Sequence, residues 1–302
     1  MNHKAGYAAI IGKPNVGKST LMNALLGEKI SITTSKPQTT RKRILGILSE
    51  ENYQVIFIDT PGILNPKYLL QEKMMEHVIA SVEDSDVLLV LIDISEDPEG
   101  KATLENESVK TVLEKSKLPK ILVLNKVDLS NDIKVKSLIA VLEKKGIFNN
   151  IIPVSASLGF NILGVKNTII EYIPEHPKYY PDDILSNENE RFFTAEIIRE
   201  KILGFYKEEI PYSCEVVVEE FKERPDEKDY ILANIYVERD SQKKIIIGKE
   251  GSAIKKIGSA ARRDIESFLG RGVFLELRVK TKENWRSSEQ MMKYFGYSKP
   301  KE

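Results

Sequence analysis

A glycine-containing run near the N-terminus has the residue types that bind phosphate. It lies between an apolar run and an amphipathic segment, and it reads Gly12-Lys13-Pro14-Asn15-Val16-Gly17-Lys18-Ser19, followed by Thr20. This is the G-x-x-x-x-G-K-S/T pattern in a strand–loop–helix setting. Glycine lets backbone amides approach an anion closely, and the positive end of the following helix faces the same anion. We expect Lys18 to contact the β- and γ-phosphates of a nucleotide and the Ser19 hydroxyl to bind Mg²⁺.

Four further polar stretches are expected near this loop, one in an irregular loop and three at the ends of strands. They are Thr39-Thr40-Arg41, Asp59-Thr60-Pro61-Gly62, Asn125-Lys126-Val127-Asp128 and Ser155-Ala156-Ser157. Asp59 can hold Mg²⁺ through water, and Gly62 can offer its N–H to a γ-phosphate. A threonine hydroxyl of the first stretch can complete the metal shell.

The third stretch predicts which base is bound. A carboxylate at Asp128 can accept two hydrogen bonds from the N1–H and N2–H₂ edge of guanine, whereas adenine would leave it unpaired. A backbone N–H of the 155–157 stretch could meet guanine O6. Singly, each stretch is explained equally well as a turn or a polar loop. Their order at the ends of successive strands predicts a GTP site.

An α/β domain is expected to position these loops. From residue 5 to about 172, apolar runs alternate with helical patterns, which predicts a largely parallel sheet whose ligands bind at the carboxyl ends of its strands. The expected strands are 7–11, 44–49, 53–58, 87–93, 120–124 and 151–154, the second and third forming an antiparallel hairpin. The expected helices are 18–26, 68–83, 101–116, 133–145 and 161–172.

A proline- and tyrosine-rich stretch indicates a domain boundary. We expect a first domain over 1–173, a linker over 174–190 and a second domain over 191–302. The second domain is predicted to contain a helix over 191–206, strands over 213–221 and 230–238, a helix over 252–269, a strand over 273–279 and a short helix near 284. The apolar run at 245–247 is expected to be a strand or a turn.

The second domain carries a candidate nucleic-acid loop, Gly248-Lys249-Glu250-Gly251. A G-x-x-G loop clamps the nucleic-acid backbone in KH modules, although alone it also fits a helix N-terminal turn. Ile247 and Ile254 supply apolar packing positions on either side of it. Residues 182–229 contain fifteen acidic and seven basic side chains, whereas residues 243–286 contain five acidic and twelve basic ones. This segregation predicts a basic surface, or else a solvated helix face, made by Lys243, Lys244, Lys255, Lys256, Arg262 and Arg263.

Composition excludes several other classes of protein. The 302 residues contain 45 basic and 45 acidic side chains, so no overall charge favours nucleic acid. The single cysteine, Cys214, excludes an internal disulfide and is expected to be a buried thiol. The three histidines have no metal-ligand spacing. Without an apolar run of membrane-spanning length or a signal peptide, we expect a cytoplasmic protein.

The motifs and their order resemble those of translation-factor-like GTPases, and more closely those of the bacterial Era family, over almost the whole chain. The resemblance implies a P-loop GTPase domain with a mostly parallel six-stranded sheet, and an α+β KH domain of type II. It implies Lys18, Thr40 and Gly62 as catalytic residues, with Ser19, Thr40 and Asp59 as the metal set. It further implies that Asn125 and Asp128 contact the base while Lys126 packs on its face.

The remaining implied contacts follow the same motifs. Nucleotide binding would extend over residues 12–20, 59–62, 125, 126, 128 and 155–157, and RNA would contact Ile247, Gly248, Lys249, Glu250, Gly251, Lys255 and Arg262. Ile63 occupies the position after the D-x-x-G glycine at which other GTPases carry a water-positioning glutamine. Related GTPases with asparagine at the Asn15 position use it to hold K⁺, although a local Asx turn also explains this residue.

We therefore expect an RNA-binding GTPase that converts GTP to GDP and phosphate with Mg²⁺, and with K⁺ as a candidate second ion. The resemblance implies binding to the single-stranded 3′ end of 16S rRNA and to the 30S subunit during ribosome assembly, by a monomer whose membrane contact is at most peripheral. One alternative is a GTP-dependent switch acting on another RNA, with catalysis incidental. Another is a tRNA-modification or ribosome-stalk GTPase, a class that lacks a KH module.

Overall fold

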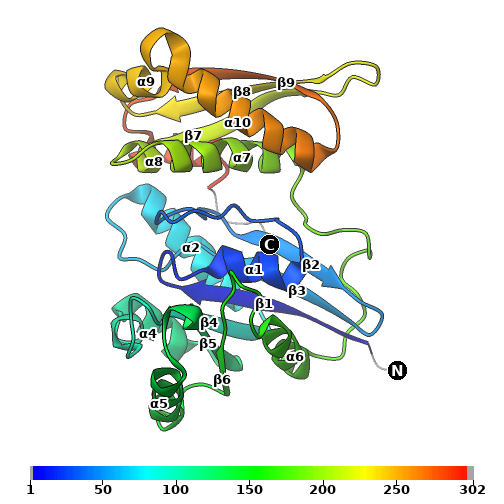
Figure 1. The fold of residues 1–302 in the computed structure, drawn as a ribbon, viewed down its shortest axis with the longest axis vertical. Coiled ribbons are helices and arrows are strands. Elements are labelled where there is room, and N and C mark those ends of the chain that lie inside the picture. Colours follow the sequence, from blue (N-terminus) through cyan, green and yellow to red (C-terminus); the bar gives the residue numbers. More distant parts are fainter. Residues whose placement is uncertain (1–2, 298–302) are drawn as a thin grey trace. The chain divides into compact units, whose positions relative to one another are not determined.

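The computed structural model describes residues 3–297, which form two compact units (Figure 1). The chain passes from the first unit to the second between Asn187 and Glu188. Among the described residues, no helix is long and apolar enough to cross a membrane.

The first unit is built on a six-stranded sheet, as the sequence predicted. Its strand order is β2-β3-β1-β4-β5-β6, and only β2 runs antiparallel to its neighbour. The strands are β1 (Lys4–Gly12), β2 (Ile44–Ser49), β3 (Tyr53–Asp59), β4 (Val87–Asp93), β5 (Lys120–Asn125) and β6 (Asn150–Pro153). Every residue of β4 is buried, because helices cover both faces of a parallel sheet.

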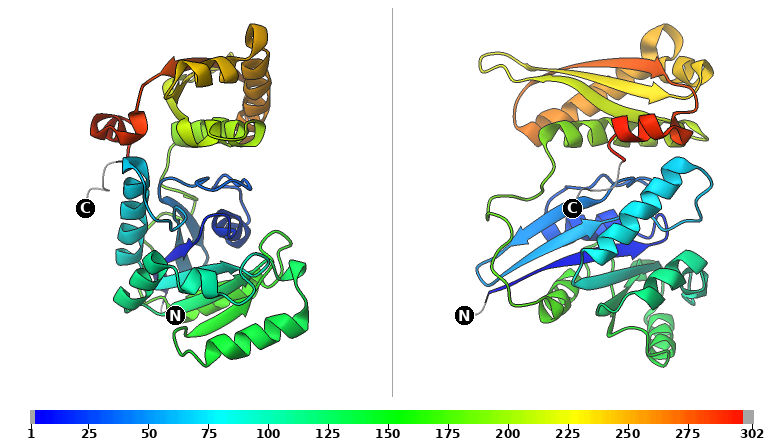
Figure 2. Two further views of the ribbon diagram at one scale, coloured as in Figure 1. Left: turned by 90° about the vertical axis from the view of Figure 1, so that its left-hand side faces the viewer. Right: turned by 180° about the vertical axis from the view of Figure 1, so that it is seen from behind.

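Helices flank this sheet on both sides (Figures 1 and 2). They are α1 (Lys18–Leu26), α2 (Leu69–Glu83), α3 (Lys101–Leu104), α4 (Glu107–Lys115), α5 (Asp132–Glu143) and α6 (Ile162–Tyr172). The prediction of one helix over 101–116 was wrong. The side chain of Asn106 accepts hydrogen bonds from the amides of Ser108 and Val109, so it begins a new helix instead of continuing the first.

The register of the sheet brings the ends of four strands to one edge. Asp59 pairs with Ile10 near the end of β1, and Gly12 pairs with Leu91. Asp93 pairs with Asn125 at the ends of β4 and β5. Each polar or glycine residue at these ends precedes a loop, so the predicted motif loops emerge side by side.

The segment after α6 is held against the first unit by a buried glutamine. Gln54 accepts hydrogen bonds from the amides of Tyr179 and Tyr180, at 2.8 and 3.0 Å, and donates to the carbonyl of Tyr180 and the hydroxyl of Ser49, both at 2.8 Å. The segment also packs Tyr180 and Ile184 onto the apolar side chains of β2 and β3. The proline-rich stretch therefore follows the surface of the first unit over most of its length.

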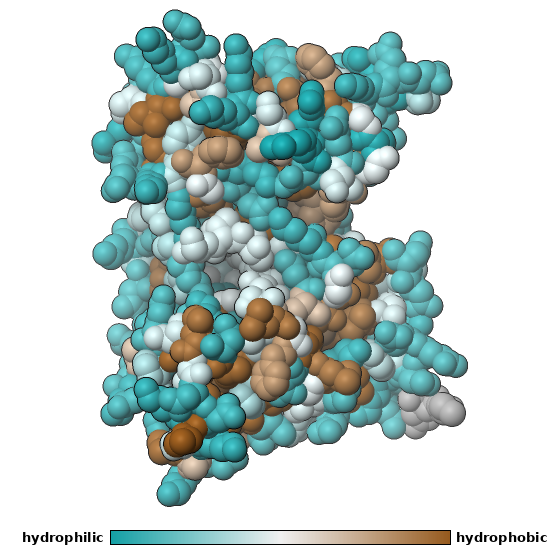
Figure 3. Space-filling view, in the orientation of Figure 1, coloured by the Kyte–Doolittle hydropathy of each residue, from teal (hydrophilic) through white to brown (hydrophobic). Residues whose placement is uncertain are grey.

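The second unit contains the helices and strands predicted for it together with two short helices that were not predicted, so its order is α-α-β-β-α-α-β-α. Its elements are α7 (Glu190–Phe205), α8 (Ile210–Ser213), β7 (Glu215–Lys222), β8 (Asp229–Val237), α9 (Asp240–Ile247), α10 (Ser252–Leu269), β9 (Val273–Thr281) and α11 (Glu289–Tyr294). In the sheet, β7 and β8 are antiparallel and β8 and β9 parallel. The face of this unit seen in Figure 3 is mostly hydrophilic.

Several local predictions for the second unit can be compared with the structure. The 245–247 run is the end of helix α9 and not a strand, and Ser213 belongs to α8, so the strand predicted from 213 begins at Glu215. Cys214 is buried, as predicted. Trp285 is also fully buried, and its indole N–H donates to the carbonyl of Ser213 at 2.9 Å, so it has a packing role.

Replacing Gln54 with alanine is expected to destabilise the protein by about 2–4 kcal/mol, because two partly buried amides would lose their acceptor and the buried Gln54 side chain would be lost. Urea unfolding followed by circular dichroism measures this change. Asn149→Ala is the control, since it removes one exposed hydrogen bond to the Lys120 amide and should cost less than about 1 kcal/mol. Equal, small effects of the two substitutions would contradict the assigned role of Gln54.

Candidate functional site

The phosphate loop connects β1 to α1 and depends on its two glycines. Gly12 and Gly17 have φ values of 154° and 96°. A Cβ atom on Gly17 would lie 2.3 Å from Nδ2 of Asn125, and one on Gly12 would lie 2.7 Å from the Leu91 carbonyl oxygen. Both the backbone conformation and the lack of space therefore require glycine, as the sequence predicted.

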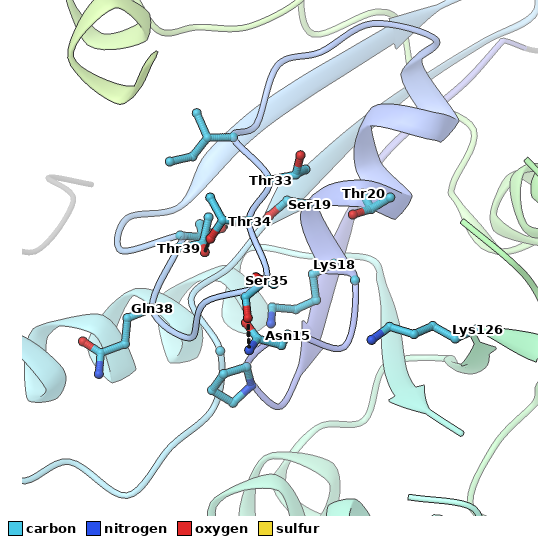
Figure 4. A pocket seen from close by; sticks show the side chains of 15 residues that line it. Asn15, Lys18, Ser19, Thr20, Thr33, Thr34, Ser35, Gln38, Thr39 and Lys126 are labelled. Carbon is cyan, nitrogen blue, oxygen red and sulfur yellow. Dashed lines mark hydrogen bonds between the residues drawn. The ribbon is translucent and has the colours of Figure 1, made fainter. Parts of the chain in front are cut away.

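Lys18 projects from the start of α1 into a cavity of about 200 Å³ (Figure 4). Its ammonium donates to the carbonyl of Lys13 at 3.0 Å. Burial lowers the pKa of Lys18 to about 8, against the opposing effect of the Asp59 carboxylate. Burial makes the charged form of Lys18 costly, and a nearby anion would stabilise it. The buried ammonium is therefore suited to binding a polyanion.

Three oxygen-bearing side chains meet beside Lys18. The Ser19 hydroxyl donates to Oδ2 of Asp59 at 2.6 Å, and the Thr40 hydroxyl donates to the same oxygen at 3.1 Å. The two hydroxyl oxygens are 2.9 Å apart. Thr39, by contrast, directs its hydroxyl to the carbonyl of Lys36 and to Thr34. The structure therefore brings together the three residues predicted as the metal set.

The Asp59 carboxylate is suited to a divalent cation. Asp59 is fully buried, and its Oδ1 has no hydrogen-bond partner among the described residues. Burial raises the pKa of this carboxyl group, against the effect of the Ser19 and Thr40 hydroxyls and of Lys18. Magnesium prefers oxygen ligands of this kind, and a bound cation would compensate the buried charge. These residues fit Mg²⁺.

The cavity also has a wall that sequence reasoning missed. Residues 28–43 form an irregular loop, and Asn15 donates to the carbonyl of Ser35 within it at 2.8 Å. The loop residues lining the cavity include Thr33, Thr34, Ser35 and Gln38 (Figure 4). Their only signal in the sequence is a polar stretch without periodicity, which does not indicate individual contacts.

The base-binding motifs adjoin the phosphate loop through Asn125. This buried side chain donates to the carbonyl of Val16 at 2.8 Å and accepts from the Ala156 amide at 3.0 Å. Lys126 forms an ion pair with Asp93, a residue that sequence reasoning also missed. Asp128 lies exposed in the short 3₁₀ turn Val127–Leu129, where its carboxylate is accessible to a base.

Ile63 cannot position a water molecule. Its side chain is buried in the core of the first unit, and its amide donates to the Gly12 carbonyl at 2.9 Å. Gly62, next to it, leaves no room for a side chain, because a Cβ would lie 2.7 Å from Pro14. The polar group that orients the attacking water must come from another residue or an ion.

The G-x-x-G loop lies between α9 and α10. Gly248 and Gly251 have φ values of 72° and 74°, and a Cβ on Gly248 would lie 2.6 Å from that of Ala253. Lys249 and Glu250 are exposed at the tip. Ile247 and Ile254 pack against the core of the second unit, which confirms their predicted role.

A groove of about 300 Å³ runs beside this loop, between α10 and β9. Lys255 and Arg262 line it together with the apolar side chains of Ile254, Leu275 and Leu277. Phe274, which sequence reasoning missed, adds a ring that is 57% exposed. The predicted basic residues extend over two hollows, because Lys256 and Arg263 line a second one with Phe205 and Lys255 lines both. The first groove offers charge for phosphates and apolar surface for bases.

Two protein-family models match the chain. One is described as a 50S ribosome-binding GTPase and matches residues 7–126, and the other is a KH domain and matches residues 209–286. GTPase Era of Caldanaerobacter subterraneus subsp. tengcongensis is 46% identical over 301 residues, which are 99% of each chain. A chloroplastic GTPase ERA-like protein of Oryza sativa subsp. japonica is 46% identical over 297 residues, which are 98% of this chain and 70% of the relative.

Solved structures give the same result over both units. A crystal structure of Era in complex with MgGDPNP and nucleotides 1506–1542 of 16S ribosomal RNA matches with a TM-score of 0.90 and 40% identity, covering 98% of this chain and 99% of that one. A variant of Aquifex aeolicus Era bound to GDP·AlF4⁻ matches with the same values.

Gly17→Ala is expected to weaken GDP and GTP binding at least about tenfold, a loss of about 1.4 kcal/mol. The added methyl group would displace Asn125 and distort the amides that face the phosphates. Gly146→Ala is a matched control, because Gly146 also has a positive φ but nothing lies within 4 Å of its Cβ position. Isothermal titration with both variants tests this, and unchanged affinity in the Gly17 variant would contradict the steric argument.

Proposed function

Because the chain belongs to the Era family of GTPases, we propose that it couples GTP hydrolysis to the binding of single-stranded ribosomal RNA. The chain hydrolyses GTP to GDP and phosphate, and Mg²⁺ accompanies the nucleotide. The observation that carries the proposal is the presence, in one chain, of the Ser19–Thr40–Asp59 cluster and of the groove beside the G-x-x-G loop. We further propose residues 1–173 as the GTPase domain, 174–190 as linker and 191–302 as KH domain.

In the proposed mechanism, the loop amides, the N-terminus of α1 and Lys18 hold the phosphates in place. Ser19, Thr40 and Asp59 would hold Mg²⁺, which supplies charge compensation on the phosphate oxygens when bound. Thr40 belongs to the irregular loop, so its engagement would order that loop in the GTP state. The Gly62 amide would contact the γ-phosphate, while Lys126, Asn125 and Asp128 hold the base and the 155–157 loop contributes an amide.

We also propose that K⁺ bound by Asn15 takes part in hydrolysis. Ile63 brings no polar group to the phosphates, so the transition-state charge needs another source of compensation. The side-chain nitrogen of Asn15 donates to the carbonyl of Ser35. The side-chain oxygen of Asn15 is a hard ligand of the type that alkali cations accept.

Replacing NaCl by KCl at constant ionic strength is expected to raise the turnover of GTP about tenfold, which corresponds to about 1.4 kcal/mol of activation free energy. Asn15→Ala should lose this dependence on K⁺. Phosphate release measured in both salts tests the proposal. Equal turnover of the wild-type protein in Na⁺ and K⁺ would count against it.

The proposed RNA is the single-stranded 3′ end of 16S rRNA. Two observations support it: a groove that combines Lys255 and Arg262 with exposed Phe274, and a full-length relative solved with nucleotides 1506–1542 of 16S ribosomal RNA. KH grooves accept unstacked nucleotides, with the G-x-x-G loop on the backbone. By this proposal the protein acts on the 30S subunit during its assembly, as a cytoplasmic monomer with at most peripheral membrane contact.

A short RNA copying this 3′ end is expected to bind more tightly with a non-hydrolysable GTP analogue than with GDP. The Gly248→Asp/Gly251→Asp variant should lose binding, because it places two negative charges at the phosphate clamp and a side chain where Gly248 has no room for one. If about four phosphates are neutralised, log K should fall with log salt with a slope of roughly −3. Fluorescence anisotropy measures both effects.

Gly270→Asp serves as the control for charge. Gly270 follows the last residue of α10, the helix that begins after the G-x-x-G loop, has a φ of 67°, and has nothing within 4 Å of its Cβ position. Binding that is indifferent to nucleotide and to the loop variant would overturn the proposal. The alternative, a switch acting on another RNA with incidental catalysis, predicts no stimulation of GTP turnover by this RNA.

A further inference from the structure

We propose that Asp93 is a positioning residue for guanine-nucleotide binding, which it assists by fixing the side chain of Lys126. The inference rests on the proposed function, because it takes Lys126 to pack on the face of the base. Asp93 belongs to none of the motifs that bind phosphate, metal or base, and it lies at the end of β4.

The carboxylate of Asp93 is held rigidly. Asp93 is 3% exposed and pairs in register with Asn125 of β5. Its Oδ1 accepts from the amide and the hydroxyl of Ser95, at 3.0 and 2.6 Å. Its Oδ2 accepts from the ammonium of Lys126. The two Ser95 donors and the buried position at the end of β4 therefore hold the carboxylate in place without the help of Lys126.

Lys126 depends on this fixed charge. Its backbone has a positive φ of 65° at the turn after β5, and its side chain is 31% exposed at the border of the phosphate cavity. Figure 4 shows the side chain extending toward the phosphate loop. An exposed lysine has many rotamers, and the loss of that freedom opposes binding. The ion pair with Asp93 selects one arrangement before the nucleotide arrives, which lowers this cost.

The contact predicts a specific pattern of nucleotide affinity. Lys126 acts on the base and not on the γ-phosphate, so loss of Asp93 should affect GDP and GTP equally. Asp93→Asn keeps an oxygen for Ser95 and replaces the other by an NH₂ group, which cannot accept from an ammonium. The variant is therefore nearly isosteric and removes mainly the hold on Lys126.

A purely structural role for Asp93 is tested with a neighbouring acid. Asp97 is also buried, and its carboxylate accepts from the amides of Ala102 and Thr103, at 3.2 and 2.7 Å, at the start of α3. Asp97→Asn removes a charge from the same loop without changing the partner of Lys126. It should lower thermal stability and leave nucleotide release unchanged.

The experiment measures dissociation of fluorescent GDP and of a fluorescent non-hydrolysable GTP analogue by stopped flow. Asp93→Asn is expected to accelerate the release of both nucleotides by about tenfold, and Lys126→Met by at least as much. The double variant should release them no faster than Lys126→Met alone, because Asp93 acts through Lys126. Asp93→Glu retains the charge but displaces it, so its release rates should lie between those of the wild type and of Asp93→Asn. If Asp93→Asn does not fold, Asp93→Glu is compared with the wild type in its place and should still release both nucleotides faster.

The outcomes separate this inference from the proposed function. Wild-type release rates in Asp93→Asn, or fully additive effects in the double variant, would overturn the role of Asp93 while Lys126→Met still accelerates release. If Lys126→Met itself leaves release unchanged, the proposed contact of Lys126 with the base fails, and the role of Asp93 fails with it. Accelerated release in Asp97→Asn would show that loop stability, not Lys126, controls dissociation.

Discussion

The nucleotide site depends on the side-chain amide of Asn125. This one group binds the phosphate loop through the Val16 carbonyl and the base loop through the Ala156 amide, partners that are 109 and 31 residues away in the chain. It also lies against Gly17, which explains why that position has no room for a side chain. Because the amide is buried, both hydrogen bonds are costly to lose. The phosphate end and the base end of the site are thereby fixed to each other.

Much of the first unit could be predicted because its central strands and its loops have local signatures. β1 and β4 are buried on both faces, so they appear in the sequence as continuous apolar runs. Glycines at positions 12 and 17 follow from the need for positive φ next to an anion, whatever the rest of the fold. The metal set was predictable by type, and the choice of Thr40 over Thr39 came from the resemblance and agrees with the hydrogen bonds of the structure.

Other features depend on tertiary contacts that a single sequence does not reveal. Three consecutive isoleucines favour a strand, but Ile246 is buried against the core of the second unit and Gly248 ends the helix, so the run is helical. Asn106 divides a helical pattern, because its side chain accepts from the first amides of α4 and so favours the start of a new helix over the continuation of α3. Asp93 and Phe274 have no signal at all, since each acquires its role only when its strand is placed beside another element.

The proline-rich segment after α6 has one more effect, which concerns self-association. A sheet ends in strands with unpaired backbone groups, and such an edge recruits strands from other molecules. Two hydrogen bonds join the segment to the edge strand β2. The Ile47 amide donates to the carbonyl of Leu185, and the Ser186 hydroxyl donates to the carbonyl of Leu45. The chain thus covers this edge with its own backbone, which protects the protein against aggregation through it.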